Sequence, residues 1–224
     1  MTLAPDGARR RLALVTGASS GIGAATALQL ARDGHDSRLT VTRGGTGARA
    51  PAAAGPLATL PQGVTSVGVG QDGGSYAPSP RPDADGGPAA SGLHDAAAWA
   101  SGYFAAINGE HPTFRGGSVA DLLATYDGTT RVNVGYLAPH GTIRYAVLGA
   151  AARPATPAET DRMLVLLASA LDAGALGLST GLEYVPATYA DEAELVALAR
   201  LLAARGVPPV SQWRGEAVGA GPRV

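Results

Sequence analysis

Residues 153–184, RPATPAETDRMLVLLASALDAGALGLSTGLEY, decide how most of this chain is expected to fold. Thr156 is followed by a proline and then by Glu159, which is the pattern of a capping box with proline at the first helical position. The leucines and methionine that follow form one apolar stripe at helical spacing. We therefore predict a helix that runs to Ala173, with Gly174 as its cap, followed by a short strand over 175–179.

The same alternation of strand and helix extends on both sides of this stretch. Apolar runs predict further strands over 64–69, 131–137 and 207–211. Amphipathic patterns predict helices over 93–106, 118–126 and 191–204. The Pro-rich segment 77–92 is predicted to be a long exposed loop. Strands that alternate with helices at this spacing indicate an α/β chain with a parallel sheet.

A glycine-rich turn near the amino terminus, TGASSGIG (16–23), lies between a predicted strand and a predicted helix. Gly17 allows a tight turn, Gly21 lets the backbone approach a pyrophosphate, and Gly23 lets the helix pack close to the strand. The helix amino terminus would offer free N–H groups to the phosphates. The turn predicts a dinucleotide site.

Residues 11–43 resemble the start of the short-chain dehydrogenase/reductase family. The resemblance implies a Rossmann-like βαβ start that binds NADP through the turn residues and through an arginine at the 2′-phosphate: Gly17, Ser19, Gly21, Ile22, Gly23 and Arg43. The family's Tyr-x-x-x-Lys pair is absent because all 17 basic residues are arginine. A nicotinamide-dependent oxidoreductase is therefore kept only as an alternative.

Composition excludes several other classes of function. The 224 residues carry a net charge of −1, so there is no basic excess with which to bind nucleic acid. Cysteine is absent, which excludes disulfides and thiolate metal sites. The uncharged run 12–31 after Arg9–Arg11 is interrupted by glycine, serine and threonine, so a leader or a membrane span is disfavoured. We expect a cytoplasmic protein without a membrane partner.

Three further segments resemble the N-acyl-D-amino-acid deacylases (D-aminoacylases) of the metal-dependent amidohydrolase superfamily. They are QGVTSVGVGQDG (62–73), NVGYLAPHGTIR (133–144) and residues 153–184, in the order in which that family has them. The resemblance implies a TIM-barrel-like fold, zinc at the carboxyl ends of the strands, and hydrolysis of a non-peptide C–N amide bond. The implied substrate is a small N-acyl amino acid.

The same resemblance assigns roles to individual residues. Asp72 stands at the position of a bridging metal ligand, and Tyr184 at that of a tyrosine that binds the substrate carboxylate. Gln212 stands where a metal-binding histidine is expected, and an amide is a poor zinc ligand. The His-x-His motif of the family is absent, and its last histidine and aspartate would lie beyond Val224. His140 follows a predicted strand and is interpreted as a structural, hydrogen-bonded histidine.

These observations predict three regions: a Rossmann-like fragment (1–43), a Gly/Ala/Pro linker (44–61) and a partial amidohydrolase barrel (62–224). A barrel of about 250 residues is typical, so the last region corresponds to about half of one. A partner chain that completes the half barrel is one possibility. Three hypotheses stay open: a catalytically incomplete amidohydrolase, a dinucleotide-binding protein, and a non-catalytic fusion fragment or the product of a frame-shifted locus.

Overall fold

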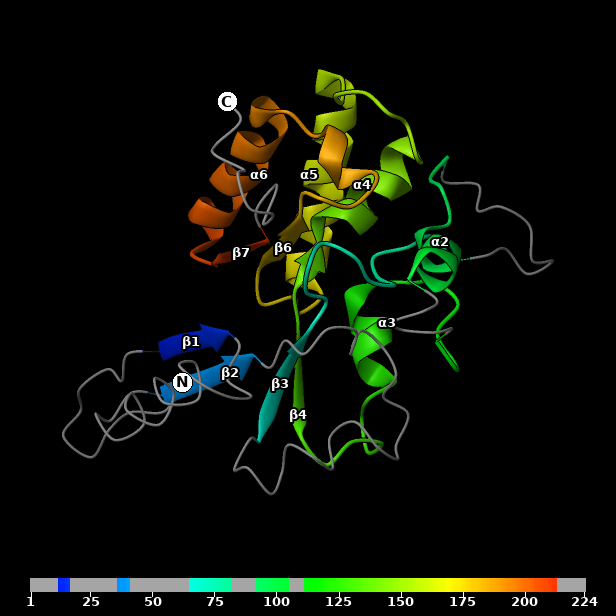
Figure 1. Ribbon diagram of the computed structural model, residues 1–224. Coiled ribbons are helices and arrows are strands. Elements are labelled where there is room, and N and C mark those ends of the chain that lie inside the picture. The colour runs from blue at the N-terminus through cyan, green and yellow to red at the C-terminus, as the bar shows by residue number, and fades with distance from the viewer. Residues whose placement is uncertain (1–11, 17–35, 41–64, 82–91, 105–110, 213–224) are drawn as a thin grey trace.

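The computed structural model describes residues 12–16, 36–40, 65–81, 92–104 and 111–212 (Figure 1). Its strands are β1 (Leu12–Thr16), β2 (Asp36–Thr40), β3 (Ser66–Val69), β4 (Asn133–Tyr136), β5 (Ala138–Pro139), β6 (Leu178–Gly181) and β7 (Pro209–Gln212). Its helices are α2 (Ala96–Tyr103), α3 (Val119–Ala124), α4 (His140–Leu148), α5 (Pro157–Asp172) and α6 (Glu192–Arg205), with a 3-10 turn η3 (Ala187–Tyr189). The predicted α/β class is confirmed.

The strands from β3 to β7 form two parallel sheets, one of two strands and one of three. β3 pairs with β4, β5 pairs with β6, and β6 pairs with β7. Leu137 joins β4 directly to β5, and its N–H donates to the carbonyl of Val69 over 2.9 Å. The next amide, that of Ala138, donates to Gly177 over 2.9 Å and so links the two ladders. The carboxyl ends of β5, β6 and β7 therefore lie at one edge, which the turn after β3 also reaches through Ser179, and such edges are where parallel α/β proteins place their sites.

Local sequence signals explain the long helices. In α5, the Thr156 hydroxyl accepts from the Glu159 amide while the Glu159 carboxylate accepts from the Thr156 amide, so the predicted capping box is confirmed. In α6 the cap is one-way: the Asp191 side chain accepts from the amide of Glu194. Gly206 ends α6 in the left-handed conformation, at φ +65°, that glycine adopts without steric cost.

One continuous core joins the helices to the sheet. α5 packs against both α4 and α6, and α4 also contacts β6. The fully buried side chains come from every layer, and they include Tyr136, Ile143, Met163, Leu167, Leu198 and Leu202. Burial of large apolar side chains of this kind is the main favourable term in the stability of the fold.

The structure corrects several sequence-based boundaries. No helix was predicted at 140–148, where α4 lies. The predicted loop 77–92 is wrong in its first part, because Ala77 and Ser79 are buried and Ser79 exchanges backbone hydrogen bonds with Gly117. The strand predicted at 175–179 begins only at Leu178.

The reason for that last shift is hydrogen bonding at the end of α5. The amide of Ala175 donates to Ala170 over 3.0 Å, and so extends the helical turn past Asp172. Gly174 lies within this turn at a φ of +103°, a conformation that glycine adopts more readily than other residues. The strand predicted at 207–211 is displaced in the same way, since the amide of Val207 donates back to Leu202 over 3.1 Å.

Two strands near the amino terminus lie within the described residues. β1 and β2 form a parallel pair in which Leu12 is opposite Asp36, as the two strands of a βαβ unit would be. The glycine turn 16–23 beyond Thr16, Arg43 and the predicted linker 44–61 lie outside the described residues.

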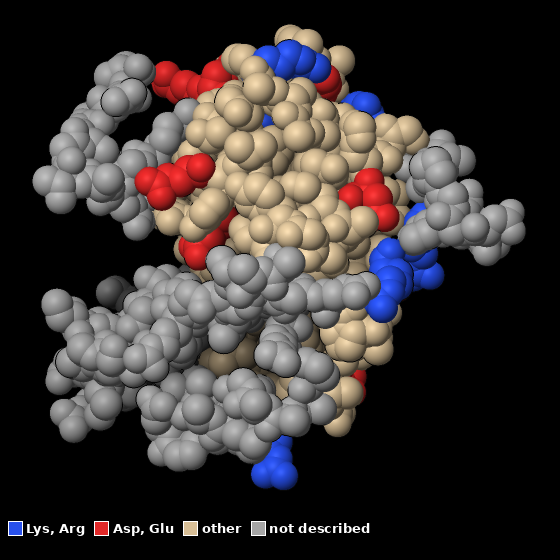
Figure 2. All heavy atoms as spheres, turned by 45° about the vertical axis from the view of Figure 1, so that its right-hand side comes forward, with Lys and Arg blue, Asp and Glu red and all other residues tan. Residues whose placement is uncertain are grey.

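The described part of the chain contains no helix that is both long enough and apolar enough to cross a bilayer. On the face shown in Figure 2, acidic and basic side chains are scattered among uncharged residues.

Candidate functional site

The carboxyl ends of β3 and β6 are in backbone contact. The chain leaves β3 through a tight turn in which Gly70, Asp72 and Gly73 all have positive φ, at +82°, +58° and +69°. A Cβ placed on Gly181, at the end of β6, would lie 1.9 Å from the carbonyl oxygen of Asp72. Glycine at position 181 therefore lets the turn after β3 lie directly against the end of β6.

Two hydroxyl groups hold this turn in place. The Ser179 hydroxyl on β6 donates to the carbonyl of Gly70 and accepts from the amide of Gly73 over 3.2 Å. The Thr142 hydroxyl on α4 donates to the carbonyl of Ser75 over 2.7 Å and accepts from the Ser75 amide over 2.9 Å. Both side chains are fully buried, so the turn after β3 is rigidly positioned at the edge of the sheet.

Tyr184 and Gln212 meet at the same edge. Gly181 is opposite Gln212 in the β6–β7 register, and a Cβ on Gly181 would lie 2.8 Å from the Tyr184 ring. Gln212 Nε2 donates to the Tyr184 hydroxyl over 3.5 Å. The Tyr184 ring packs edge-on against Phe104, with centroids 6.0 Å apart. The candidate site is therefore the cluster of Asp72, Gly181, Tyr184 and Gln212.

A buried ionic cluster connects α4 to α6. His140, the first residue of α4, places Nε2 2.6 Å from Glu194 Oε1. Arg144 donates to the other Glu194 oxygen and, over 2.5 Å, to the carbonyl of Arg153. All three ionisable side chains are at most 1% exposed. This placement supports the structural interpretation of His140.

Two opposing effects set the protonation of Glu194. Burial raises the pKa of this carboxyl, but hydrogen bonds and charge from His140 and Arg144 lower it by more. The net direction is downward, so the ionised form is favoured in the folded protein.

The described residues do not offer a set of zinc ligands. They contain no group of three or more histidine, cysteine, aspartate or glutamate side chains that are arranged to hold a metal. Asp72 is an exposed residue of the turn after β3, and its backbone carbonyl lies against Gly181 at the end of β6. Zinc sites in proteins need three or four such donors. The assignment of Asp72 as a metal ligand therefore stays a prediction.

The described histidines have structural surroundings instead. Nδ1 of His111 accepts from the amide of Phe114 over 2.8 Å, and burial together with the charge of Arg115 lowers the pKa of His111. The ring of His94 packs edge-on against Tyr145, with centroids 5.9 Å apart. His35 lies outside the described residues.

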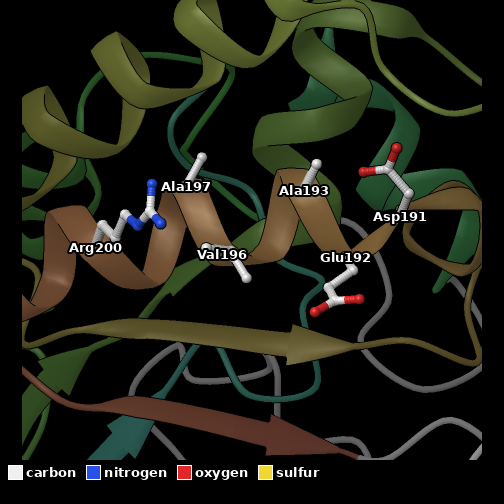
Figure 3. A pocket seen from close by; sticks show the side chains of 6 residues that line it. All are labelled: Asp191, Glu192, Ala193, Val196, Ala197 and Arg200. Atoms are coloured by element: carbon white, nitrogen blue, oxygen red, sulfur yellow. The ribbon is translucent and has the colours of Figure 1, made fainter. Parts of the chain in front are cut away.

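A separate pocket runs along α6 (Figure 3). It is lined by residues of this one helix and of its cap: Asp191, Glu192, Ala193, Val196, Ala197 and Arg200. Most of these side chains are exposed, and none of them belongs to the cluster at the strand ends. The pocket is therefore a surface groove beside the helix, distinct from the candidate site.

The sequence-based site residues thus have different outcomes. Tyr184 and Gln212 are brought together, and Asp72 lies against the same glycine. The dinucleotide residues Gly17 to Gly23 and Arg43 lie outside the described residues. Residues 179–181 were interpreted from the sequence as pocket-lining residues or as the cap of a turn, and the Ser179 hydroxyl indeed binds a turn, the one after β3. Sequence analysis missed Glu194 as the partner of His140, because a glutamate in a first helical turn is too common to be singled out.

Comparisons with known proteins agree with the second resemblance. The chain is 39% identical over 160 residues to the N-acyl-D-glutamate deacylase of Alcaligenes xylosoxydans xylosoxydans, which is 69% of this chain and 28% of the relative. It is 33% identical over 158 residues to the D-aminoacylase of the same organism, which is 70% of this chain and 29% of the relative. The chain spans less than a third of the length of either protein. No protein-family model matches it.

The chain is also similar to a solved deacylase structure. The N-acyl-D-glutamate deacylase of Bordetella bronchiseptica, in complex with zinc and a phosphonate mimic of the tetrahedral intermediate, superposes with a TM-score of 0.56 at 34% identity. The match covers 72% of this chain and 30% of that protein. The comparisons give no support to the dehydrogenase-like interpretation of 11–43. About seven tenths of the chain is therefore similar, in sequence and in structure, to part of the N-acyl-D-amino-acid deacylases, which are amidohydrolases.

Proposed function

We propose that this chain supplies the substrate-binding side of an amidohydrolase that acts on N-acyl amino acids. The observation that carries the proposal is the convergence of Tyr184, Gln212 and the turn at Asp72 at the carboxyl ends of parallel strands. The similarity to deacylases, one of them solved with a mimic of the reaction intermediate, supports an N-acyl amino acid as the ligand class.

Tyr184 would bind the ligand carboxylate in this proposal. Its hydroxyl lies at the strand ends, and its ring is held by Phe104. A hydroxyl that donates to a carboxylate contributes more than one that donates to a neutral group. The contact would orient the acyl amino acid with its amide toward the ends of β6 and β7.

The chemical step itself is not assigned to the described residues. Amidohydrolases of this kind use a metal-bound water, whereas the described residues bring together no set of metal donors. We therefore propose that this chain is catalytically incomplete by itself: it binds the ligand without hydrolysing it.

The experiment is a titration of N-acetyl-D-glutamate by calorimetry, with wild-type protein and with Tyr184→Phe. The variant should bind at least about tenfold more weakly, because a hydrogen bond to a charged group is lost. Tyr145→Phe is the matched control, since that ring stacks on Trp99, with centroids 4.7 Å apart, and should not affect binding. Equal binding by all three proteins, or no binding by any of them, would contradict the proposal.

A second titration tests the catalytic part. With zinc added in excess, the protein should release no acetate above the background rate. Stoichiometric zinc in the purified protein together with acetate release would show that the metal site is complete.

Dinucleotide binding remains a second candidate because β1 and β2 are parallel on either side of the glycine-rich segment. An NADPH fluorescence titration tests it, with Arg43→Ala expected to weaken NADPH more than NADH. No binding at high micromolar NADPH would remove this candidate.

A further inference from the structure

The side chain of Gln212 has one amide atom engaged and one without a partner. Nε2 donates to the Tyr184 hydroxyl over 3.5 Å. Oε1 is buried and has no hydrogen-bond partner. A buried carbonyl oxygen without a donor is destabilising and is uncommon unless a ligand or water supplies the donor.

Tyr184 offers a hydrogen-bond donor, its hydroxyl proton, beside this acceptor. Its hydroxyl oxygen already accepts from Gln212, so its proton is free to point away from that bond. Among the described residues, no acceptor for this proton is found within hydrogen-bonding distance. Gln212 and Tyr184 therefore present an acceptor and a donor side by side at the ends of β7 and β6.

A matching ligand must carry a donor next to an acceptor. In an N-acyl amino acid, the amide N–H and the carboxylate are attached to the same α-carbon and are thus neighbours in this way. A ligand ester has the same shape but carries no N–H, so it would leave Gln212 Oε1 unpaired.

We propose that Gln212 determines specificity by accepting the amide N–H of the ligand at Oε1, while Tyr184 donates to the ligand carboxylate. The inference rests on the proposed function, and it adds a role for a residue that stands where the deacylase resemblance places a histidine. The side chain that is unsuited to hold zinc recognises instead the N–H that separates an amide from an ester.

The test compares two ligands that differ in one group: N-acetyl-D-glutamate and its oxygen analogue, in which –O– replaces –NH–. Wild-type protein should bind the amide about three- to tenfold more tightly, which corresponds to one neutral hydrogen bond. Gln212→Met, which keeps the length of the side chain but removes the acceptor, should bind both ligands equally.

Two control variants separate this role from others. Gln71→Met makes the same change at the end of β3, where the unpartnered amide atom is the donor Nε2, and should keep the preference for the amide. Tyr184→Phe should weaken both ligands by the same factor, because both carry the carboxylate.

The outcomes are distinct. Equal affinity of the wild-type protein for amide and ester would overturn the role of Gln212 and leave the proposed function standing. Failure of both ligands to bind would overturn the proposed function and the inference with it. A preference for the amide that survives in Gln212→Met would assign the discrimination to another residue. If Gln212→Met does not fold, the comparison of the two ligands on wild-type protein still decides.

Discussion

Glu194 is the residue whose ionisation should affect stability most. It is 1% exposed and accepts from both His140 and Arg144. Glu194→Gln leaves a buried guanidinium without its counter-charge, so the free energy of unfolding should fall by about 3–5 kcal/mol in a urea titration. The surface pair Arg205–Asp172 provides the control, and Asp172→Asn should cost less than about 1 kcal/mol. Equal losses of free energy of unfolding in the two variants would contradict the larger stabilising contribution expected of the buried Glu194 carboxylate.

The same carboxylate predicts an acid-dependent loss of stability. Burial raises the pKa of Glu194, but His140 and Arg144 lower it by more, so the folded protein binds its proton less readily than the unfolded chain. Its stabilising contribution is then complete above the unfolded pKa and is lost as the pH falls through the lower folded pKa. Urea titrations from pH 7 down to pH 3 should show this decline, and Glu194→Gln should flatten it. If the free energy of unfolding of Glu194→Gln falls with pH as steeply as that of the wild type, the ionisation of Glu194 is not the cause of the decline.

Gly181 tests the close contact between strand ends. A methyl group there would meet the Asp72 carbonyl, which is backbone and has no side-chain freedom with which to move away. Gly181→Ala should therefore destabilise the protein by about 1–3 kcal/mol and weaken ligand binding. Gly102→Ala is the control, because nothing lies within 4 Å of its Cβ position in α2 and alanine favours helix by about 0.5–1 kcal/mol. Thermal unfolding of both variants separates the two effects, and a stabilised Gly181→Ala would be incompatible with the contact.

At the scale of elements, the capping box of α5 should make a measurable contribution. Thr156→Ala removes the acceptor for the Glu159 amide and should lower the free energy of unfolding by about 1 kcal/mol. Thr156→Ser keeps the acceptor and should stay within a few tenths of the wild-type value. Chemical denaturation measures both variants, and equal stability of the two would show that the cap contributes nothing.

Sequence analysis succeeded for elements whose signals are local and failed where tertiary contacts decide. α5 was predicted because its cap and its apolar stripe depend only on residues that are close together in the sequence. α4 was missed because Pro139 precedes it without a side-chain cap. It is stabilised by burial of Ile143 and Val147 and by the ion pair of Arg144 with Glu194, fifty residues away.

The candidate site shows the same division. Tyr184 was singled out by resemblance, and Gln212 by its departure from the resemblance. That the two side chains meet follows from the register that places Gly181 opposite Gln212, and register between distant strands cannot be derived from either strand alone. The role proposed for Gln212 in ligand binding therefore rests on the three-dimensional arrangement.

At the scale of the whole molecule, the parallel strands β3 to β7 and their covering helices form the scaffold (Figure 1), and Tyr184 and Gln212 meet where β6 and β7 end. The chain spans about three tenths of the length of its deacylase relatives. The groove along α6 is the competing location for a ligand, and it shares no residue with the strand-end cluster (Figure 3).

The measurement that tests the central claim most directly is a chemical-shift map of the amide signals during titration with N-acetyl-D-glutamate. The account predicts that the largest changes fall on residues 70–73, 179–184 and 211–212, and that Tyr184→Phe suppresses them. Changes confined to residues 191–200 along α6, or no changes at all, would contradict it.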